Sequence, residues 1–152
     1  MKSNPTPGNV LIVDDNEDDA RLARRALGKL FPQLCTRSVH SGEEFIAYLQ
    51  GDDGFSDRME FPYPILALLD LKMGGLDGFD VLLWLRNHPP HNYLPVIVLT
   101  VSGEMSLVKR AYALGARSFL TKPLGANELQ SAVNGLQDWL QLVRSPVLLA
   151  SR

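Results

Sequence analysis

Short apolar runs recur along the chain and alternate with longer segments of mixed character. The clearest run covers residues 65–70, reads Ile-Leu-Ala-Leu-Leu-Asp, and lies between Pro64 and the Gly74-Gly75 pair. A continuous apolar run of this length between turn residues predicts a strand that is buried on both faces. Comparable runs at residues 10–13, 34–39, 96–99 and 118–121 predict four more strands, of which 34–39 is the weakest.

The segments between these runs carry apolar residues at helical spacing. In the first of them Ala20, Ala23, Leu27 and Leu30 share one face, Asn16 is the expected helix cap, and Phe31-Pro32 ends the helix. Four further helices are predicted: one after a capping box of Ser41 and Glu44, one over 79–84, one over 107–114 that Gly115 closes, and one over 129–143.

Five strands that alternate with five helices predict an α/β fold, a doubly wound five-stranded parallel sheet with helices on both faces. We expect one domain over residues 9–143, a short polar segment at 1–8 and a tail at 144–152. Residues 51–64 are polar, lack a clear period and are predicted to form an exposed loop. That loop is long for a compact α/β unit, where such connections typically have about 2–6 residues.

Composition adds limits to this picture. The chain has 152 residues, 45% of them hydrophobic and 21% charged, which suits one globular domain with its own core. The formal net charge of -2 gives no basic field that would favour nucleic acid or an acidic membrane surface. Cys35 is the single cysteine, so no intrachain disulfide is possible, which agrees with a reducing cytosol. No apolar stretch approaches the roughly 20 residues of a membrane span. We therefore expect a cytoplasmic protein.

Polar side chains follow the predicted strands where each strand ends. Asp14 and Asp15 follow the first strand, Asp70 ends the third, Thr100 follows the fourth and Lys122 the fifth. Since the carboxyl ends of parallel strands lie at one edge of a sheet, these five side chains are expected to meet there.

Three carboxylates at one place repel one another unless a cation neutralises them. Mg²⁺ suits oxygen ligands and keeps some of its waters, while Lys122 adds a positive charge and Thr100 adds a hydroxyl. This combination is suited to receiving a phosphoryl group, whose transition state spreads negative charge over its oxygens. Asp70 is the natural nucleophile, because a carboxylate can carry phosphate as an acyl phosphate.

At these residues the chain resembles a known family. Val-Asp14-Asp15, Leu-Leu-Asp70, Asp77-Gly78, Val-Leu-Thr100 and Thr-Lys122-Pro123, in this order, are similar to the receiver domain of two-component response regulators. The resemblance covers about residues 9–143 and implies the flavodoxin-like receiver fold. It also implies a signalling module that catalyses only its own phosphorylation and dephosphorylation.

The resemblance assigns roles to single residues. Asp70 would be the phosphoacceptor, supplied by a phosphohistidine on a partner histidine kinase. Asp15, Asp70 and the backbone carbonyl of Lys72 would bind Mg²⁺, and Asp14 would act through a metal-bound water. Lys122 and Thr100 would contact the phosphoryl oxygens, and Phe119 falls at the family's switch aromatic. The response is expected near residues 104–142.

A finer resemblance rests on the acidic residues at 14–19, the arginine-rich first helix and the loop at 51–64. Together they look most like the single-domain receivers that serve bacterial phytochrome-type histidine kinases. Without an output domain, the signal would pass to another protein, to a homodimer or to onward phosphotransfer. Lys72, Gly74 and Val101 depart from the usual family pattern, and all three leave open how long the phosphoryl group stays.

Three alternatives remain at this point. An aspartyl-phosphate phosphatase of the haloacid dehalogenase type would use the same metal and nucleophile, but needs an acid where this chain has Lys72. A nucleotide-binding Rossmann domain would need a glycine-rich turn after the first strand, where this chain has Asp-Asp-Asn. A receiver-shaped scaffold that is never phosphorylated would keep the fold without the chemistry.

Overall fold

The computed structural model describes residues 8–135, and within them strands and helices alternate from end to end. The strands are β1 (Asn9–Val13), β2 (Cys35–Val39), β3 (Leu66–Leu69), β4 (Val96–Thr100) and β5 (Ser118–Thr121). The helices are α1 (Glu17–Leu30), α2 (Gly42–Gln50), α3 (Gly78–Arg86), α4 (Met105–Ala113) and α5 (Ala126–Asn134), with a short 3-10 turn, η1 (His91–Tyr93).

All strand pairs are parallel, and the order across the sheet is β2-β1-β3-β4-β5. This is the flavodoxin-like order, with the reversal of strand order between β1 and β3, and it differs from the order of the Rossmann fold. The prediction of a doubly wound parallel sheet is therefore confirmed, and the nucleotide-binding Rossmann alternative is wrong.

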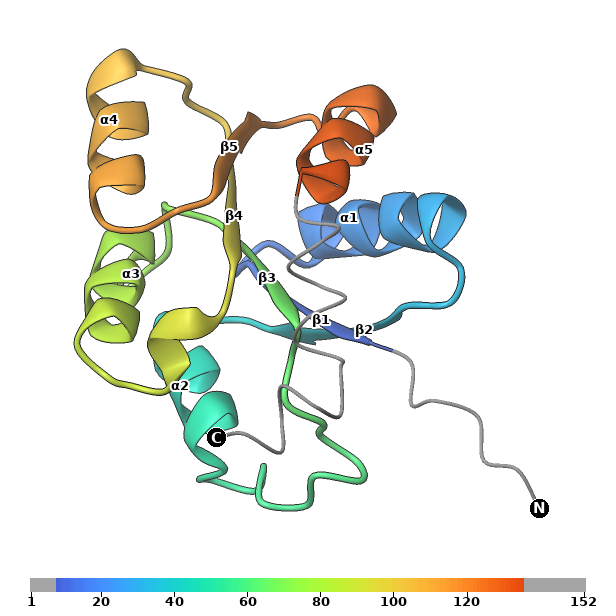
Figure 1. Cartoon of the computed structure of the whole chain (residues 1–152), viewed down its shortest axis with the longest axis vertical. Helices are drawn as coiled ribbons and strands as arrows, with labels where there is room; N and C mark the ends of the chain where they lie inside the picture. The colour runs from blue at the N-terminus through green and yellow to red at the C-terminus, as the bar shows by residue number, and fades with distance from the viewer. Residues whose placement is uncertain (1–7, 136–152) are drawn as a thin grey trace.

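Helices cover both faces of the sheet. Helices α1 and α5 lie on one face, and α2, α3 and α4 lie on the other (Figure 1). Successive residues of β1 point to opposite faces, so that Leu11 and Val13 join the core beneath α2 and α3, while Val10 and Ile12 join the core beneath α1 and α5. Both faces of β1 and β3 are buried, as the continuous apolar runs predict.

The local signals place most helix ends correctly. The side chain of Asn16 accepts a hydrogen bond from the backbone N–H of Asp19, and α1 ends at Phe31. Ser41 caps α2 as expected, but the Glu44 carboxylate accepts from the backbone N–H of His40 rather than completing the predicted capping box. The last predicted helix is present as α5, and its predicted continuation from residue 136 to 143 lies outside the described residues.

The segment 51–64 has no helix or strand and most of its residues are exposed, as predicted, but some of its side chains pack against the protein. Phe55 and Phe61 pack against Tyr48 of α2, with ring centroids 5.0 and 6.0 Å from the tyrosine ring. The guanidinium of Arg58 donates to the carbonyl oxygens of Tyr48, Leu49 and Phe61 at 2.8–3.3 Å. The loop therefore folds back and closes the carboxyl end of α2.

At the amino end of the sheet, this loop is also tied to β1. The Asn9 side-chain amide donates to the hydroxyl of Tyr48 and to the carbonyl of Pro62, and the Tyr48 hydroxyl donates to the same carbonyl. Tyr48 is 1% exposed.

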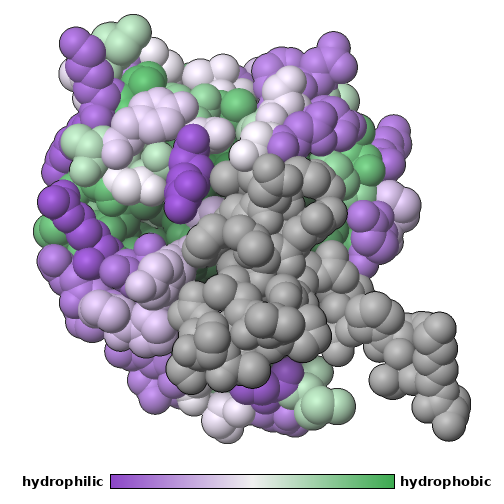
Figure 2. Space-filling view, in the orientation of Figure 1, coloured by the Kyte–Doolittle hydropathy of each residue, from purple (hydrophilic) through white to green (hydrophobic). Residues whose placement is uncertain are grey.

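The face of the molecule shown in Figure 2 is mostly hydrophilic, with apolar side chains set in a recess. Among the helices that the structure describes, none is long and apolar enough to cross a membrane.

Candidate functional site

The side chains predicted to meet at the carboxyl edge of the sheet come from four neighbouring strands. Asp14 and Asp15 follow β1, Asp70 follows β3, Thr100 is the last residue of β4, and Lys122 follows β5. Backbone hydrogen bonds continue past the strand ends: Asp70 donates to Val13 at 2.9 Å and Lys122 donates to Thr100 at 2.8 Å. The sheet itself therefore fixes how these residues lie.

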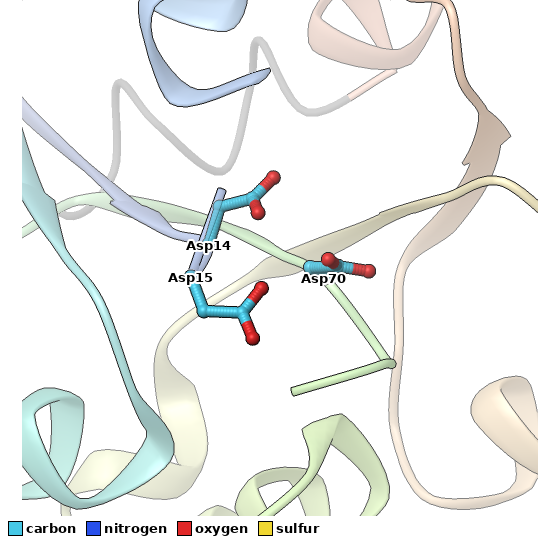
Figure 3. Close-up of side chains that lie close together, drawn as sticks. All are labelled: Asp14, Asp15 and Asp70. Atoms are coloured by element: carbon cyan, nitrogen blue, oxygen red, sulfur yellow. The ribbon is translucent and has the colours of Figure 1, made fainter. Parts of the chain in front are cut away.

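Three carboxylates form an acidic cluster. Asp14, Asp15 and Asp70 each offer an oxygen, and these oxygens lie within 4.8 Å of one another (Figure 3). Asp14 and Asp70 are buried, while Asp15 is exposed. A set of carboxylate oxygens at the edge of the fold, one of them open to solvent, has the donor chemistry that a hard divalent cation takes. The residues therefore fit a divalent metal.

Lys122 places an ammonium group beside this cluster. Its Nζ donates to Oδ2 of Asp14 and of Asp19 at 2.8 Å each, and to Oδ2 of Asp70 at 3.3 Å. Burial disfavours the charged lysine, but the hydrogen bonds to Asp14 and Asp19 and the charges of the acids outweigh it and raise the pKa of Lys122. The ammonium stays charged at neutral pH.

Asp70 is the acid whose environment disfavours its charge. Burial raises the pKa of this carboxyl, against the opposing effects of the Lys122 ammonium and of the backbone N–H of Lys72, while the Asp14 charge adds to the rise. The Lys72 N–H donates to Oδ1 of Asp70 at 3.2 Å. Both carboxylate oxygens of Asp70 thus accept a hydrogen bond, but the negative charge of the group is only partly compensated.

The loop after Asp70 depends on two glycines. A Cβ on Gly78 would lie 2.6 Å from the Leu71 Cα and 2.7 Å from the Asp70 carbonyl oxygen, so that only glycine lets α3 start this close to the acid. Gly75 has φ +71, a left-handed conformation that favours glycine. The Glu43 carboxylate accepts from the Leu76 N–H at 3.3 Å and so ties the loop to α2.

Thr100 and Phe119 lie on adjacent strands. Thr100 is fully buried, and its hydroxyl has no hydrogen-bond partner within residues 8–135. Phe119 is half-buried beside a surface cavity of about 490 Å³ between β5 and α5. The structure thus places an unpaired hydroxyl one strand away from Asp70, and an aromatic ring at the surface where Tyr112 of α4 also lies.

The three residues that depart from the usual family pattern, Lys72, Gly74 and Val101, are all exposed. The Lys72 side chain points to solvent while its backbone N–H serves Asp70. Val101 is 65% exposed and lines a groove of about 220 Å³ together with Lys122, Leu22 and Leu124.

Sequence reasoning did not connect Asp19 with Lys122. Asp19 lies in the first turn of α1, and its carboxylate is as close to the ammonium as that of Asp14. The signal was available, because Asp19 precedes the buried Ala23 by four residues and so lies on the helix face that packs against the sheet.

Comparison with known proteins agrees with this geometry. The family model described as response regulator receiver domain matches residues 10–134. Response regulator Rcp1 from Synechocystis sp. (strain ATCC 27184 / PCC 6803 / Kazusa) is 32% identical over 95% of this chain and 97% of its own length.

Solved structures give the same result. The bacteriophytochrome response regulator AtBRR is similar with a TM-score of 0.77 and 31% identity, over 88% of this chain and 94% of that chain. The Mn²⁺-bound form of response regulator Rcp1 is similar with a TM-score of 0.71 and 30% identity, over 88% of this chain and 95% of that chain.

Proposed function

Because this chain belongs to the response regulator receiver domain family, we propose that Asp70 accepts a phosphoryl group from a histidine kinase in a Mg²⁺-dependent reaction. The family implies a histidine kinase as the partner and signalling as the role. The observation that carries the proposal is the position of Asp70, between the acidic cluster and the Lys122 ammonium at the carboxyl edge of the sheet.

In the proposed transfer, a carboxylate oxygen of Asp70 forms a bond to phosphorus as the bond from phosphorus to the histidine nitrogen breaks. The electron pair of the broken bond stays on the imidazole. Lys122, already charged and 3.3 Å from Asp70, donates to an oxygen of the arriving group. The buried hydroxyl of Thr100 donates to another, which supplies the partner that it lacks among the described residues.

The proposed metal ligands are Asp15, Asp70 and the backbone carbonyl of Lys72, with Asp14 acting through a bound water. The acidic cluster supports a divalent cation, and we take Mg²⁺ as that cation because the site offers hard oxygen donors. Mg²⁺ bound there supplies the positive charge that lets the phosphoryl oxygens approach three acids. The relative Rcp1 has been solved in a Mn²⁺-bound form.

Two self-catalysed steps belong to the proposal: phosphorylation from a small phosphodonor and hydrolysis of the acyl phosphate. Lys72, Gly74 and Val101 bear on the second step, because they lie along the loops that flank Asp70 and Lys122. Phe119 is proposed to change its position when Thr100 bonds the phosphoryl group, since the two residues lie on adjacent, paired strands.

Further parts of the proposal concern the cellular setting. The similarity to AtBRR supports a phytochrome-type kinase as the specific partner, and a homodimer is one of the proposed outputs. The cytoplasm is the proposed location, and residues 9–143 are the proposed extent of the receiver domain.

The proposal is tested by incubating the protein with acetyl phosphate and Mg²⁺ and measuring its intact mass. We expect the mass to increase by one phosphoryl group, and the increase to disappear with chelator or in Asp70→Asn. The matched control is Asp77→Asn, which alters a half-buried acid that caps α3 outside the cluster and should leave the mass increase in place. No mass increase in the wild-type protein, or an equal increase in Asp70→Asn, contradicts the proposal.

A further inference from the structure

We propose that Asp19 is a positioning residue that holds Lys122 back from Asp70 and competes with the phosphoryl group for the lysine's donors. This inference rests on the proposed function and adds to it a residue outside the acidic cluster. The acidic cluster consists of Asp14, Asp15 and Asp70, so Asp19 has no part in the proposed metal site.

The three N–H donors of the Lys122 ammonium are all in use. An ammonium has three donors, and here they go to Asp14, Asp19 and Asp70. The two short bonds, both 2.8 Å, go to Asp14, which follows β1, and to Asp19 in the first turn of α1, and the 3.3 Å bond goes to Asp70. The lysine is therefore held more closely by the α1 side of the site than by the phosphoacceptor.

The acceptors differ in how easily they can give up the lysine. The Asp14 side chain is 5% exposed, and its Oδ1 also accepts from the Asn16 N–H at 2.9 Å. The Asp19 side chain is 33% exposed, and Lys122 is its carboxylate's partner within residues 8–135. Water can replace Lys122 at Asp19, whereas the buried Asp14 would lose a bond that water cannot restore.

A phosphoryl group on Asp70 brings negatively charged oxygens that need a donor in this place. Since Lys122 has no spare N–H, we expect it to move toward the phosphoryl oxygens and to release one of its two 2.8 Å bonds, and of these the bond to the partly exposed Asp19 costs less to release. Phosphorylation would then free the Asp19 carboxylate at the groove between α1 and the segment after β5, which Leu22 and Leu124 also line. While Asp19 keeps the lysine, it lowers the affinity of the site for the phosphoryl group.

The test measures the affinity for beryllofluoride, a phosphoryl analogue, by isothermal titration calorimetry of the full chain in saturating Mg²⁺. Asp19→Ala is expected to lower the Kd roughly two- to fivefold, the range for a partly exposed ion pair. Asp19→Glu restores the carboxylate and should bring the Kd back toward the wild-type value. Should Asp19→Ala fail to fold, Asp19→Asn, which keeps the shape of the side chain, takes its place. Asp19→Asn is also expected to bind beryllofluoride more tightly than wild type.

The matched control is Asp18→Ala. Asp18 carries the same charge in the same turn of α1, but its side chain is 84% exposed and pairs with Arg21. Its removal should leave the Kd unchanged. The Asp19→Ala effect should also persist from about 0.15 M to about 1 M salt, where the Debye length falls from about 8 Å to about 3 Å and distant charges are screened.

The outcomes separate the two proposals. A wild-type protein that binds no beryllofluoride contradicts the proposed function, and the role of Asp19 falls with it. A wild-type protein that binds it, with Asp19→Ala equal to wild type, weaker than wild type or matched by Asp18→Ala, contradicts the role of Asp19 alone.

Discussion

The two ends of the sheet handle buried polar groups in opposite ways. At the carboxyl end, Asp14, Asp70 and Lys122 bring charges together, and the Thr100 hydroxyl has no partner among the described residues. At the amino end, Tyr48 and Arg58 direct their donors to backbone carbonyls of α2 and of the loop at 51–64.

The two ends of the sheet differ in the role of their polar groups. Donors that bond to the chain's own carbonyls stabilise the fold and are not free for a ligand, although the buried Oδ1 of Asn9 at this end also has no partner within residues 8–135. Acids that share one lysine remain partly uncompensated until a cation arrives. Stability and chemistry are thus expected to separate along the strand direction, and substitutions at the two ends test this separation.

The largest expected effect is at the amino end. Tyr48→Ala should lower the free energy of unfolding by about 3–5 kcal/mol, because it removes a fully buried ring that packs against Phe55 and Phe61. Urea unfolding followed by circular dichroism measures the loss. The extra stability that Mg²⁺ gives should be the same as in wild type, because the substitution lies at the opposite end of the sheet.

The control for this substitution is Tyr112→Ala in α4, where the ring is 47% exposed and the expected change is within about 0.5 kcal/mol. A loss below about 1 kcal/mol for Tyr48→Ala, or a loss of the Mg²⁺ effect, would show that the ends are not separate in this way.

The next effect is smaller and has the opposite sign. Asp70→Asn should raise the free energy of unfolding by roughly 1 kcal/mol in chelator at pH 7, a typical size for a single substitution, because Lys122 keeps Asp14 and Asp19 as partners and one of the repelling acids is removed. Burial raises the pKa of Asp70, so the folded state favours its neutral form. The Asp70 carboxyl therefore contributes stability below the pKa that it has in the unfolded chain, and this contribution is lost as the pH rises through its pKa in the folded protein. Asparagine stays neutral at every pH and so avoids this loss.

Urea unfolding with and without Mg²⁺ measures the stability of the metal-free protein and the change in stability on adding Mg²⁺. Wild type should gain stability from Mg²⁺, and Asp70→Asn should gain little. Asp18→Asn, at an exposed acid, should behave like wild type. A metal-free Asp70→Asn protein less stable than wild type would mean that Asp70 stabilises the fold through Lys122.

The smallest effect is expected from Tyr63, again near the amino end. Burial raises the pKa of its hydroxyl to about 12, against the opposing charge of Arg58. Because the folded pKa is the higher one, the contribution of Tyr63 is present below pH 10 and is lost as the pH rises from about 10 toward 12. Wild type should therefore lose more stability over this window than Tyr63→Phe.

Urea unfolding at several alkaline pH values measures this difference between the two proteins. Lys122 and Tyr48 also have raised pKa values, but they titrate in both proteins, so the difference isolates Tyr63. Parallel losses in wild type and Tyr63→Phe would show that the tyrosine hydroxyl is not protected.

Sequence reasoning predicted the sheet because its strands are buried on both faces and therefore read as unbroken apolar runs. It also predicted that Asp70 and Lys122 meet, because residues that follow parallel strands share an edge whatever their distance along the chain. These inferences need only the period of the pattern and the topology of the fold.

The loop at 51–64 and Asp19 show where such inference ends. Phe55, Arg58 and Phe61 have no period, because their contacts with α2 depend on how the loop bends back. The spacing from Asp19 to Ala23 predicts which face of α1 carries Asp19, but whether its carboxylate reaches Lys122 depends on tertiary packing and on the side-chain conformations. The hydrophobic pattern predicts where the helices and strands lie, whereas the contacts of single side chains depend on tertiary packing.

Lys122 joins residues that lie 52, 103 and 108 positions away along the chain. An unfolded chain cannot offer this set of groups, so a cation or a non-covalent phosphoryl analogue that binds here binds the native state alone. By mass action, a ligand at about 100 times its Kd then stabilises the fold by about 2.7 kcal/mol. The occupancy of this site would therefore also set the lifetime of such a protein against proteases, with the cation-loaded molecules surviving longest.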